Sequence, residues 1–173
     1  MQNRSINGWL WGPWSRLGLI VALVALVLDQ AHKWWMLIGY RIQDKGRVAI
    51  GPFLDLVYIK NIGISYGVGA GQIGQHALAA FAALAALALA IWLARSATGW
   101  LMAVSLGLII GGAIGNAIDR LTLGGVADFF SLHAFGFYWY VFNVADVAIV
   151  VGVAGLLYDS FGRGRKGAAN AAS

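Results

Sequence analysis

Two aspartates, Asp128 and Asp146, have the types and surroundings from which chemistry is expected, because both lie in or beside long apolar segments. A carboxylate in a bilayer is costly unless it is paired or hydrated, so such a residue usually has a function. Two carboxyl groups held close together cannot both ionise easily, and one keeps its proton near neutral pH. The pair would then supply a general base and a general acid that titrate together.

Each of these aspartates has polar neighbours in the sequence. Asn143 lies three residues before Asp146. Asp128 follows a polar group at the end of the preceding apolar segment, made of Asn116, Asp119 and Arg120. Two interpretations of that group remain open: its members satisfy one another and cap a helix, or they support a site. Asp128 itself has the alternative of a solvated loop position, which is the usual place for an aspartate.

Metal and thiol chemistry find little support in this sequence. The chain contains no cysteine, which excludes disulfides, thiolate metal sites and a cysteine nucleophile. Its histidines stand far apart, without the ligand spacing of a zinc site, at positions His32, His76 and His133. We therefore expect no metal site, and acid–base chemistry by two carboxyl groups needs no organic cofactor.

The composition places these residues in an integral membrane protein. Of 173 residues, 60% are hydrophobic and only 11% are charged, and the mean hydropathy is +0.74. Soluble domains average about 25% charged residues. The net charge of +5 is better explained by topology and contact with lipid than by nucleic acid. No basic stripe with interleaved aromatics lies outside the apolar segments, so we expect no nucleic-acid partner.

Four apolar stretches are long enough to cross a bilayer, which takes about 20 helical residues. Tryptophan and tyrosine crowd their ends, as expected at a membrane interface. The sequence therefore predicts an all-α integral membrane protein whose transmembrane helices lie near residues 17–38, 76–94, 100–118 and 138–158. The first stretch resembles a signal peptide, but Asp29 and Lys33 follow without a small-residue cleavage site, which favours a retained helix.

The extramembrane segment 39–75 predicts a small β-sheet between the first two helices. Residues 47–50 and 53–60 are rich in Val, Ile, Phe and Tyr, and Gly51-Pro52 separates them, which is typical of two short strands. We expect residues 1–160 to form one membrane-embedded domain. Residues 161–173 are expected to form a basic, disordered cytoplasmic tail.

An even number of spans places both termini on one side of the membrane. The basic tail and Arg95 in a short loop favour the cytoplasm, although the basic residues on the two sides are nearly balanced. In this orientation the polar ends of three helices meet in the outer leaflet, and Lys33 lies one turn beyond Asp29 on the same helix face. We therefore predict a site near the extracytoplasmic face.

The third apolar segment carries two neighbouring stripes. Gly107, Gly111 and Gly115 form a doubled G-x-x-x-G pattern, which allows another helix to approach closely. The adjacent stripe contains Gly112, followed by Asn116 and Asp119. We predict that the first stripe packs against a helix and that the second faces a polar pocket.

Five sequence blocks, in order, resemble lipoprotein signal peptidase (signal peptidase II), a family of bacterial membrane aspartyl proteases. They are D-Q-A-H-K from Asp29, N-I-G-I-S-Y from Asn61, G-G-A-I-G-N-A-I-D-R from Gly111, V-A-D-F from Val126 and F-N-V-A-D from Phe142. The resemblance spans the first helix to the fourth. One departure is Ser65-Tyr66, where Ala-Phe is more usual, and it concerns substrate contacts rather than the chemistry.

The resemblance implies four transmembrane helices, an extracytoplasmic β-cradle and a short interfacial helix. It also implies a monomer in the bacterial inner membrane, in contact with lipids. Its substrate is a prolipoprotein with a diacylglyceryl group on the lipobox cysteine, cut just before that cysteine. The catalytic dyad falls on Asp128 and Asp146. Supporting residues fall on Asp29, Lys33, Asn61, Gly112, Asn116, Asp119, Arg120, Asn143 and Ala145. We further expect Asn116 and Asn143 to hold the carboxylates or the substrate backbone, and Arg120 to pair with Asp119.

Three alternatives remain. A Ser/Lys protease would use Ser65 as nucleophile with Lys33 or Lys60 as base, but it leaves the aspartates unexplained. A small proton-coupled transporter would use intramembrane Asp and Lys residues as a relay, although the polar groups gather in one leaflet rather than along a path. The third alternative is a scaffold that only binds lipid.

Overall fold

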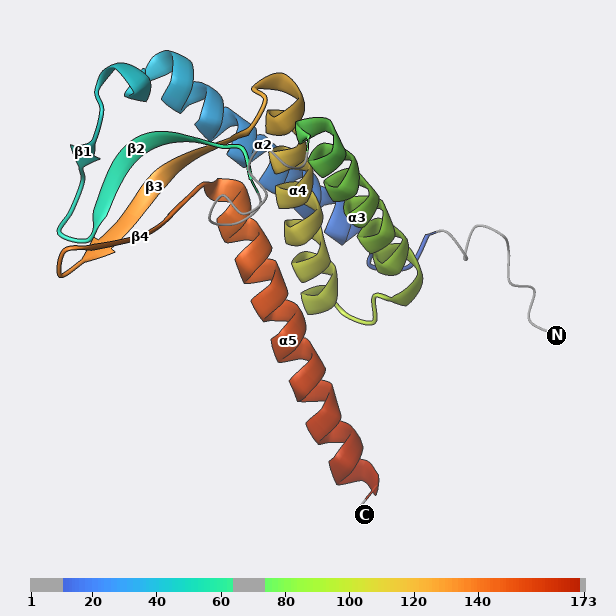
Figure 1. Cartoon of the computed structure of the whole chain (residues 1–173). Helices are drawn as coiled ribbons and strands as arrows, with labels where there is room; N and C mark the ends of the chain where they lie inside the picture. The colour runs from blue at the N-terminus through green and yellow to red at the C-terminus, as the bar shows by residue number, and fades with distance from the viewer. Residues whose placement is uncertain (1–10, 64–73, 172–173) are drawn as a thin grey trace.

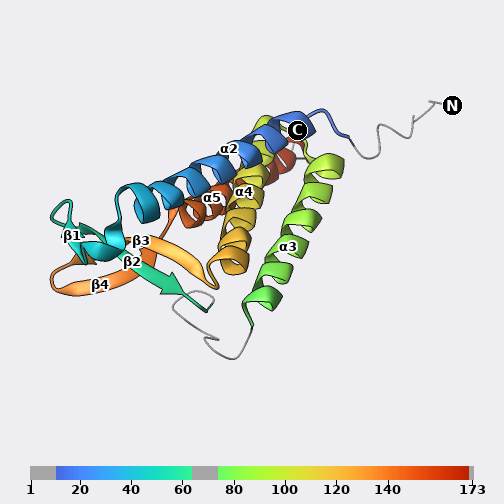
Figure 2. The same cartoon turned by 90° about the horizontal axis from the view of Figure 1, so that it is seen from above.

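The computed structural model describes residues 11–63 and 74–171, with side chains as far as Phe161. Within that part of the chain, four helices are long and apolar enough to span a membrane. The helices are α2 (Ser15–Trp34), α3 (Gln75–Ser96), α4 (Trp100–Thr122) and α5 (Val144–Ala171). Figures 1 and 2 show α4 between the other helices, and Figure 1 shows α5 extending well beyond the bundle. The four predicted spans are therefore confirmed as helices, with changed bounds.

Glycines on α4 explain its central position. A Cβ atom on Gly107 or Gly111 would overlap the backbone carbonyl of Gly18 or Ala22, so α2 packs directly on this stripe. The close packing predicted for this pattern is confirmed. Gly112 behaves differently from the prediction: a Cβ atom there would lie 2.5 Å from the carbonyl oxygen of Ala145. Gly112 therefore lets α5 approach α4 and does not face a polar pocket.

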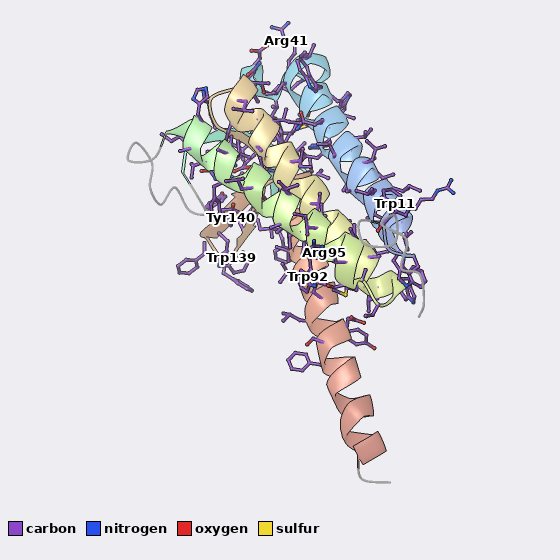
Figure 3. The ribbon with its side chains drawn as sticks, turned by 90° about the vertical axis from the view of Figure 1, so that its right-hand side faces the viewer. Trp11, Arg41, Trp92, Arg95, Trp139 and Tyr140 are labelled. Atoms are coloured by element: carbon purple, nitrogen blue, oxygen red, sulfur yellow. The ribbon has the colours of Figure 1, made fainter. Side chains whose placement is uncertain are left out.

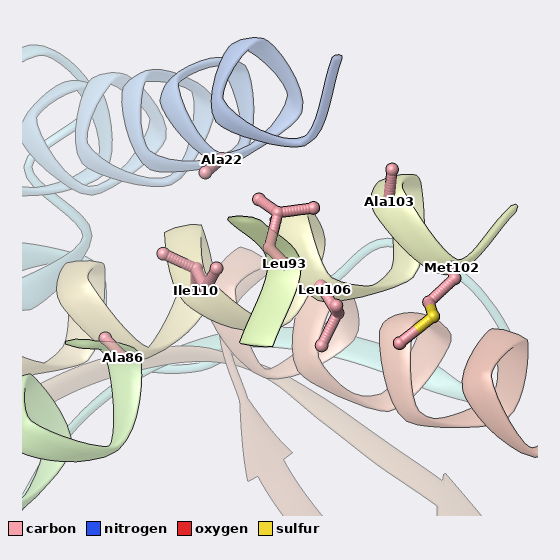
Figure 4. Close-up of a cluster of buried hydrophobic side chains, with 7 residues drawn as sticks. All are labelled: Ala22, Ala86, Leu93, Met102, Ala103, Leu106 and Ile110. Carbon is pink, nitrogen blue, oxygen red and sulfur yellow. The ribbon is translucent and has the colours of Figure 1, made fainter. Parts of the chain in front are cut away.

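Small and aliphatic side chains fill the interior between the helices, as Figure 4 shows. Leu106 of α4 and Leu93 of α3 are almost fully buried there. The opposite faces of the helices are apolar but exposed: Leu23 is 60% exposed and Val150 67%. A helix that is apolar on both faces suits a bilayer, where lipid covers its outer side. The buried cluster consists of Ala22, Ala86, Leu93, Met102, Ala103, Leu106 and Ile110.

The close approach of α2 and α4 leads to a stability prediction. Gly111→Ala should lower the stability of the folded protein by about 1 to 3 kcal/mol, because the added methyl group forces two backbones apart. Gly99→Ala is the matched control, since a Cβ atom at Gly99 meets nothing within 4 Å. Thermal unfolding of both variants in the same detergent measures the difference. Equal melting temperatures would contradict the proposed packing.

A four-stranded antiparallel sheet lies at one end of the bundle, in the order β1-β2-β3-β4. Its strands are β1 (Val48–Ala49), β2 (Leu54–Asn61), β3 (Val126–Ala134) and β4 (Phe137–Phe142). The two strands predicted between the first two helices are confirmed. The sheet is not confined to that segment, however, because β3 and β4 come from the connection between α4 and α5.

The predicted start of the fourth helix at residue 138 is wrong. Residues 138–142 belong to β4, and α5 begins at Val144. Phe135 and Gly136 form the preceding turn with positive φ values of 51° and 81°, which allow the chain to reverse tightly. The aromatic residues of β4 favour a strand as well as a membrane interface, so their type alone does not distinguish the two.

Pairing between β2 and β3 determines where Asp128 lies. Ile59 pairs with Asp128, and Asn61 pairs with Val126. The other side of the sheet is fixed by a buried cluster in which Phe129 and Ala127 of β3 pack on Met36 and Ile42. Met36 belongs to the π-helical segment η1 (Trp35–Gly39), which continues α2, and Ile42 to the 3₁₀ segment η2 (Ile42–Asp44). The sheet is thereby anchored to the end of α2.

The chain ends differ in part from the expectation. Instead of a disordered segment from residue 161, the backbone of α5 stays helical through Ala171. Figure 3 shows Arg41, beyond one end of α2, far from Trp11 at the other end. The glycine-rich segment between β2 and α3, which includes Ser65 and Tyr66, lies outside the described residues except at its ends.

Candidate active site

Asp128 and Asp146 line one cavity of about 290 Å³. Asp128 is the third residue of β3 and is 1% exposed, whereas Asp146 lies in the first turn of α5. The cavity therefore forms where the sheet meets the bundle. Its walls are Asn61, Asn116, Arg120, Val126, Asp128, Tyr140, Asp146, Ile149 and Val150.

Asn143 joins the two carboxyl groups. Its side-chain Nδ2 donates a hydrogen bond of 2.7 Å to Asp128 Oδ1, and its backbone N–H donates one of 3.2 Å to Asp146 Oδ2. In return, the backbone N–H of Asp146 donates to Asn143 Oδ1 at 2.9 Å. This reciprocal arrangement is a capping box at the start of α5. The spacing N-x-x-D thus caps the start of α5, and the same residues hold both acids in place.

Two further amides hold the carboxylates from the other side. Asn116 Nδ2 donates to Asp146 Oδ1 at 2.9 Å, and Asn61 Nδ2 donates to Asp128 Oδ2 at 3.2 Å. Both oxygens of each carboxyl group therefore accept a hydrogen bond, which fixes the plane of the group. The expectation that Asn116 and Asn143 hold the carboxylates agrees with these contacts.

Behind the cavity, Lys33 forms a buried ion-pair cluster with two carboxylates. Its Nζ lies 2.8 Å from Asp29 Oδ2 and 2.7 Å from Asp119 Oδ2, and all three side chains are at most 2% exposed. Lys33 also donates to Asn116 Oδ1 at 3.2 Å, and the same oxygen accepts from Asn143 Nδ2. The cluster is thus connected to both members of the dyad through two asparagines.

The two carboxylates beside Lys33 also hold the backbone next to Asp128 and Asp146. Asp29 Oδ1 accepts the N–H of Ala145, next to Asp146, at 2.9 Å. Asp119 Oδ2 accepts the N–H of Ala127, next to Asp128, at 3.1 Å. These bonds explain why apolar helices such as α2 and α4 carry the buried residues Asp29 and Asp119. Gln30, which the sequence did not single out as a site residue, donates to Asp119 Oδ1 at 3.0 Å.

The predicted pairing of Arg120 with Asp119 is wrong. The ion pair of Asp119 among the described residues is with Lys33, because consecutive residues on a helix point about 100° apart. Arg120 instead donates to the backbone carbonyl of Asn116 at 3.1 Å and to that of Gly63 at 3.2 Å. It therefore joins the end of α4 to the chain just after β2.

Burial and, second, the negative charge of Asp146 together raise the pKa of Asp128 to about 7. The amides of Asn143 and Asn61 act in the opposite direction, since they stabilise the ionised form. Near neutral pH, Asp128 can therefore both hold and release a proton.

Sequence reasoning missed Tyr140, which lines the cavity but was expected to belong to a helix. Tyr140 lies two residues before the end of β4, so its place in the cavity could have been predicted only by recognising that strand. Of the residues in the Ser/Lys alternative, Ser65 lies outside the described residues, and Lys33 is already bound to two carboxylates.

Comparisons with known proteins identify the family of this chain. The profile of the family described as "Signal peptidase (SPase) II" matches residues 21–162. A lipoprotein signal peptidase from Rhodopseudomonas palustris is 60% identical over 151 residues, which cover 84% of this chain and 92% of that protein. One from Methylocella silvestris is 50% identical over 146 residues, covering 83% and 85%. A solved bacterial membrane enzyme superposes with a TM-score of 0.74 at 25% identity, over 87% of this chain and 90% of that one. The chain belongs to the signal peptidase II family.

Proposed function

We propose that this multi-pass membrane protein removes the signal peptide from prolipoproteins, cutting just before a cysteine that carries a diacylglyceryl group. Asp128 and Asp146 are the proposed catalytic dyad. The observation that carries the proposal is that one residue, Asn143, holds both buried carboxyl groups at a single cavity. Family membership favours this protease over the transporter and over the lipid-binding scaffold.

In the proposed reaction, the ionised carboxylate takes a proton from a water molecule while the water oxygen attacks the scissile carbonyl carbon. The protonated partner donates its proton to the carbonyl oxygen. When the tetrahedral intermediate collapses, the C–N bond breaks and the first carboxyl group gives its proton to the leaving amine of the cysteine. The partner carboxylate takes a proton back from one hydroxyl of the intermediate, which restores both carboxyl groups to their starting states. The raised pKa of Asp128 makes it suitable as the initial acid. The expectation that no metal or cofactor takes part remains a prediction.

We also propose that both termini lie in the cytoplasm and that the dyad lies near the outer face of the inner membrane. Supporting this, the last two turns of α2, the last two turns of α4 and the first turn of α5 contribute to one polar cluster. A substrate anchored by its lipid presents the scissile bond at a fixed depth, where such helix ends can meet it. The monomeric state, the lipid contacts and the absence of a nucleic-acid partner remain predictions.

The direct test uses purified protein and a prolipoprotein that carries the diacylglyceryl group. Wild-type protein should release the signal peptide, seen as a mobility shift on a gel and confirmed by mass. The same prolipoprotein without the lipid is the matched control and should stay intact. Addition of EDTA should leave the rate unchanged. No cleavage of the lipid-modified substrate would contradict the proposal.

The raised pKa of Asp128 predicts a particular pH dependence. As pH rises through about 7, Asp128 loses its proton, the acid is lost, and kcat/KM should fall by about tenfold per pH unit. Asn61→Ala removes a hydrogen bond that favours the ionised form, so the falling limb should move to higher pH. Measurements of kcat/KM from about pH 5 to about pH 9 test both points. A falling limb that stays in place in Asn61→Ala would argue against Asp128 as the titrating group.

A further inference from the structure

A second cavity, of about 280 Å³, meets the catalytic cavity at Asp128. Asn61 and Tyr140 also line both cavities. The remaining walls of the second cavity come from the end of β2 and from β4, the two strands that flank β3. We call it the strand trough, defined by Ile59, Lys60, Asn61, Ile62, Asp128, Trp139, Tyr140 and Val141. Because the cavities share Asp128, a substrate bound at the dyad can extend into both.

The two cavities extend along different elements of the fold. The catalytic cavity includes Ile149 and Val150 of α5, and Val150 lies about 6 Å beyond Asp146 along the helix axis, at 1.5 Å per residue. It therefore continues beside two of the candidate membrane spans. In contrast, every residue of the strand trough lies outside the four candidate spans. Among the described residues, the trough thus leads from Asp128 away from the candidate spans.

The walls of the strand trough are apolar and exposed. Trp139 on β4 is 63% exposed, and Ile59 and Ile62 on the opposite wall are 41% and 44% exposed. Figure 3 shows Trp139 next to Tyr140 at the side of the helices. An exposed tryptophan is a large and rigid surface for binding, and it is common at energetically important contacts. Two such walls on either side of Asp128 can hold a narrow, extended segment of chain.

We propose that the strand trough binds the polypeptide that follows the lipid-modified cysteine, in an extended conformation, with an apolar side chain packed against Trp139. This inference rests on the proposed function. A signal peptide and a diacylglyceryl group are both apolar and remain with lipid, on the side of Ile149 and Val150. The segment after the cysteine must leave the membrane, and the trough is the cavity at the dyad that lies on that path. Trp139 is therefore a specificity-determining residue.

Two synthetic lipid-modified substrates test this inference. Both share the signal peptide and the diacylglyceryl cysteine; one ends there as an amide, and the other continues with leucine and three further residues. Wild-type protein should cleave the longer substrate with a kcat/KM about tenfold higher, as expected when one apolar side chain is buried. Trp139→Ala should reduce this ratio to near one. Phe137→Ala, on the same strand but outside the trough and 73% exposed, should keep the wild-type ratio.

Ile62→Ala, on the opposite wall, provides a second variant if Trp139→Ala fails to fold, and it should also reduce the ratio. Equal cleavage of both substrates by wild-type protein would overturn the inference while leaving the proposed function intact. A uniform loss on both substrates in Trp139→Ala would also overturn it, since Trp139 would then contact the shared part. If wild-type protein cleaves neither substrate, the proposed function fails and this inference fails with it.

Discussion

Replacing either Asp128 or Asp146 with asparagine should abolish release of the signal peptide, with kcat/KM reduced at least about 10³-fold. Asparagine has nearly the same shape as aspartate but cannot exchange a proton at neutral pH. The amide donors around the two carboxyl groups come from three asparagines, so the geometry of the cavity should survive the change. Loss of activity would then report the missing proton transfer.

The gel assay on lipid-modified prolipoprotein measures this effect, and thermal unfolding confirms that each variant is folded. Asp44→Asn is the matched control, because Asp44 is exposed and pairs only at the surface with Arg41. Its activity should equal that of the wild type. Substantial release by a folded Asp128→Asn or Asp146→Asn protein would remove that residue from the dyad.

Replacing Lys33 with methionine should have the largest effect on stability, about 3 to 5 kcal/mol. Methionine preserves most of the volume but leaves Asp29 and Asp119 buried, unpaired and close to one another. Each of them also accepts a hydrogen bond from a backbone N–H next to Asp146 or Asp128. Activity should therefore fall together with stability.

The exposed Lys60 provides the control, since Lys60→Met should change stability by less than about 0.5 kcal/mol. Unfolding of both variants in detergent measures the difference. Adding Asp119→Asn to Lys33→Met removes one of the repelling charges and should recover part of the loss. A Lys33→Met protein as stable as the wild type would show that the cluster is not a stabilising ion pair.

The helices of this fold could be predicted from sequence because a bilayer imposes a minimum apolar length. The doubled glycine pattern also identified the face of α4 on which α2 packs. Half of the sheet could not be predicted, because β3 pairs with β2, about 70 residues earlier in the chain, and β4 joins the sheet only by pairing with β3. No local pattern reports such pairing, and the aromatic residues of β4 fit a membrane interface equally well.

The part of the candidate site that depends on local contacts within one helix could be predicted from the sequence. Asn143 and Asp146 form a capping box, whose spacing is visible in sequence. The partner of Arg120 was not predictable, because it depends on Gly63, which reaches the site only through the sheet. Similarly, the role of Gly112 became clear only when α5 was placed beside α4. The two acids could thus be predicted from the sequence, whereas the contacts of Arg120 and Gly112 depend on the tertiary structure.

The hydrogen bond between Asp29 and the N–H of Ala145 joins residues 116 positions apart, and it has a consequence for how the enzyme is made. Membrane insertion proceeds from the N-terminus, so α2 and its aspartate enter the bilayer long before α5 is synthesised. Asp146 and its capping residue arrive with the last helix. Until then, Asp128 lacks its second carboxyl group and the amide of Asn143. With the proposed dyad, a partly translated chain is therefore expected to be proteolytically inert, and the enzyme to become active only when its insertion is complete.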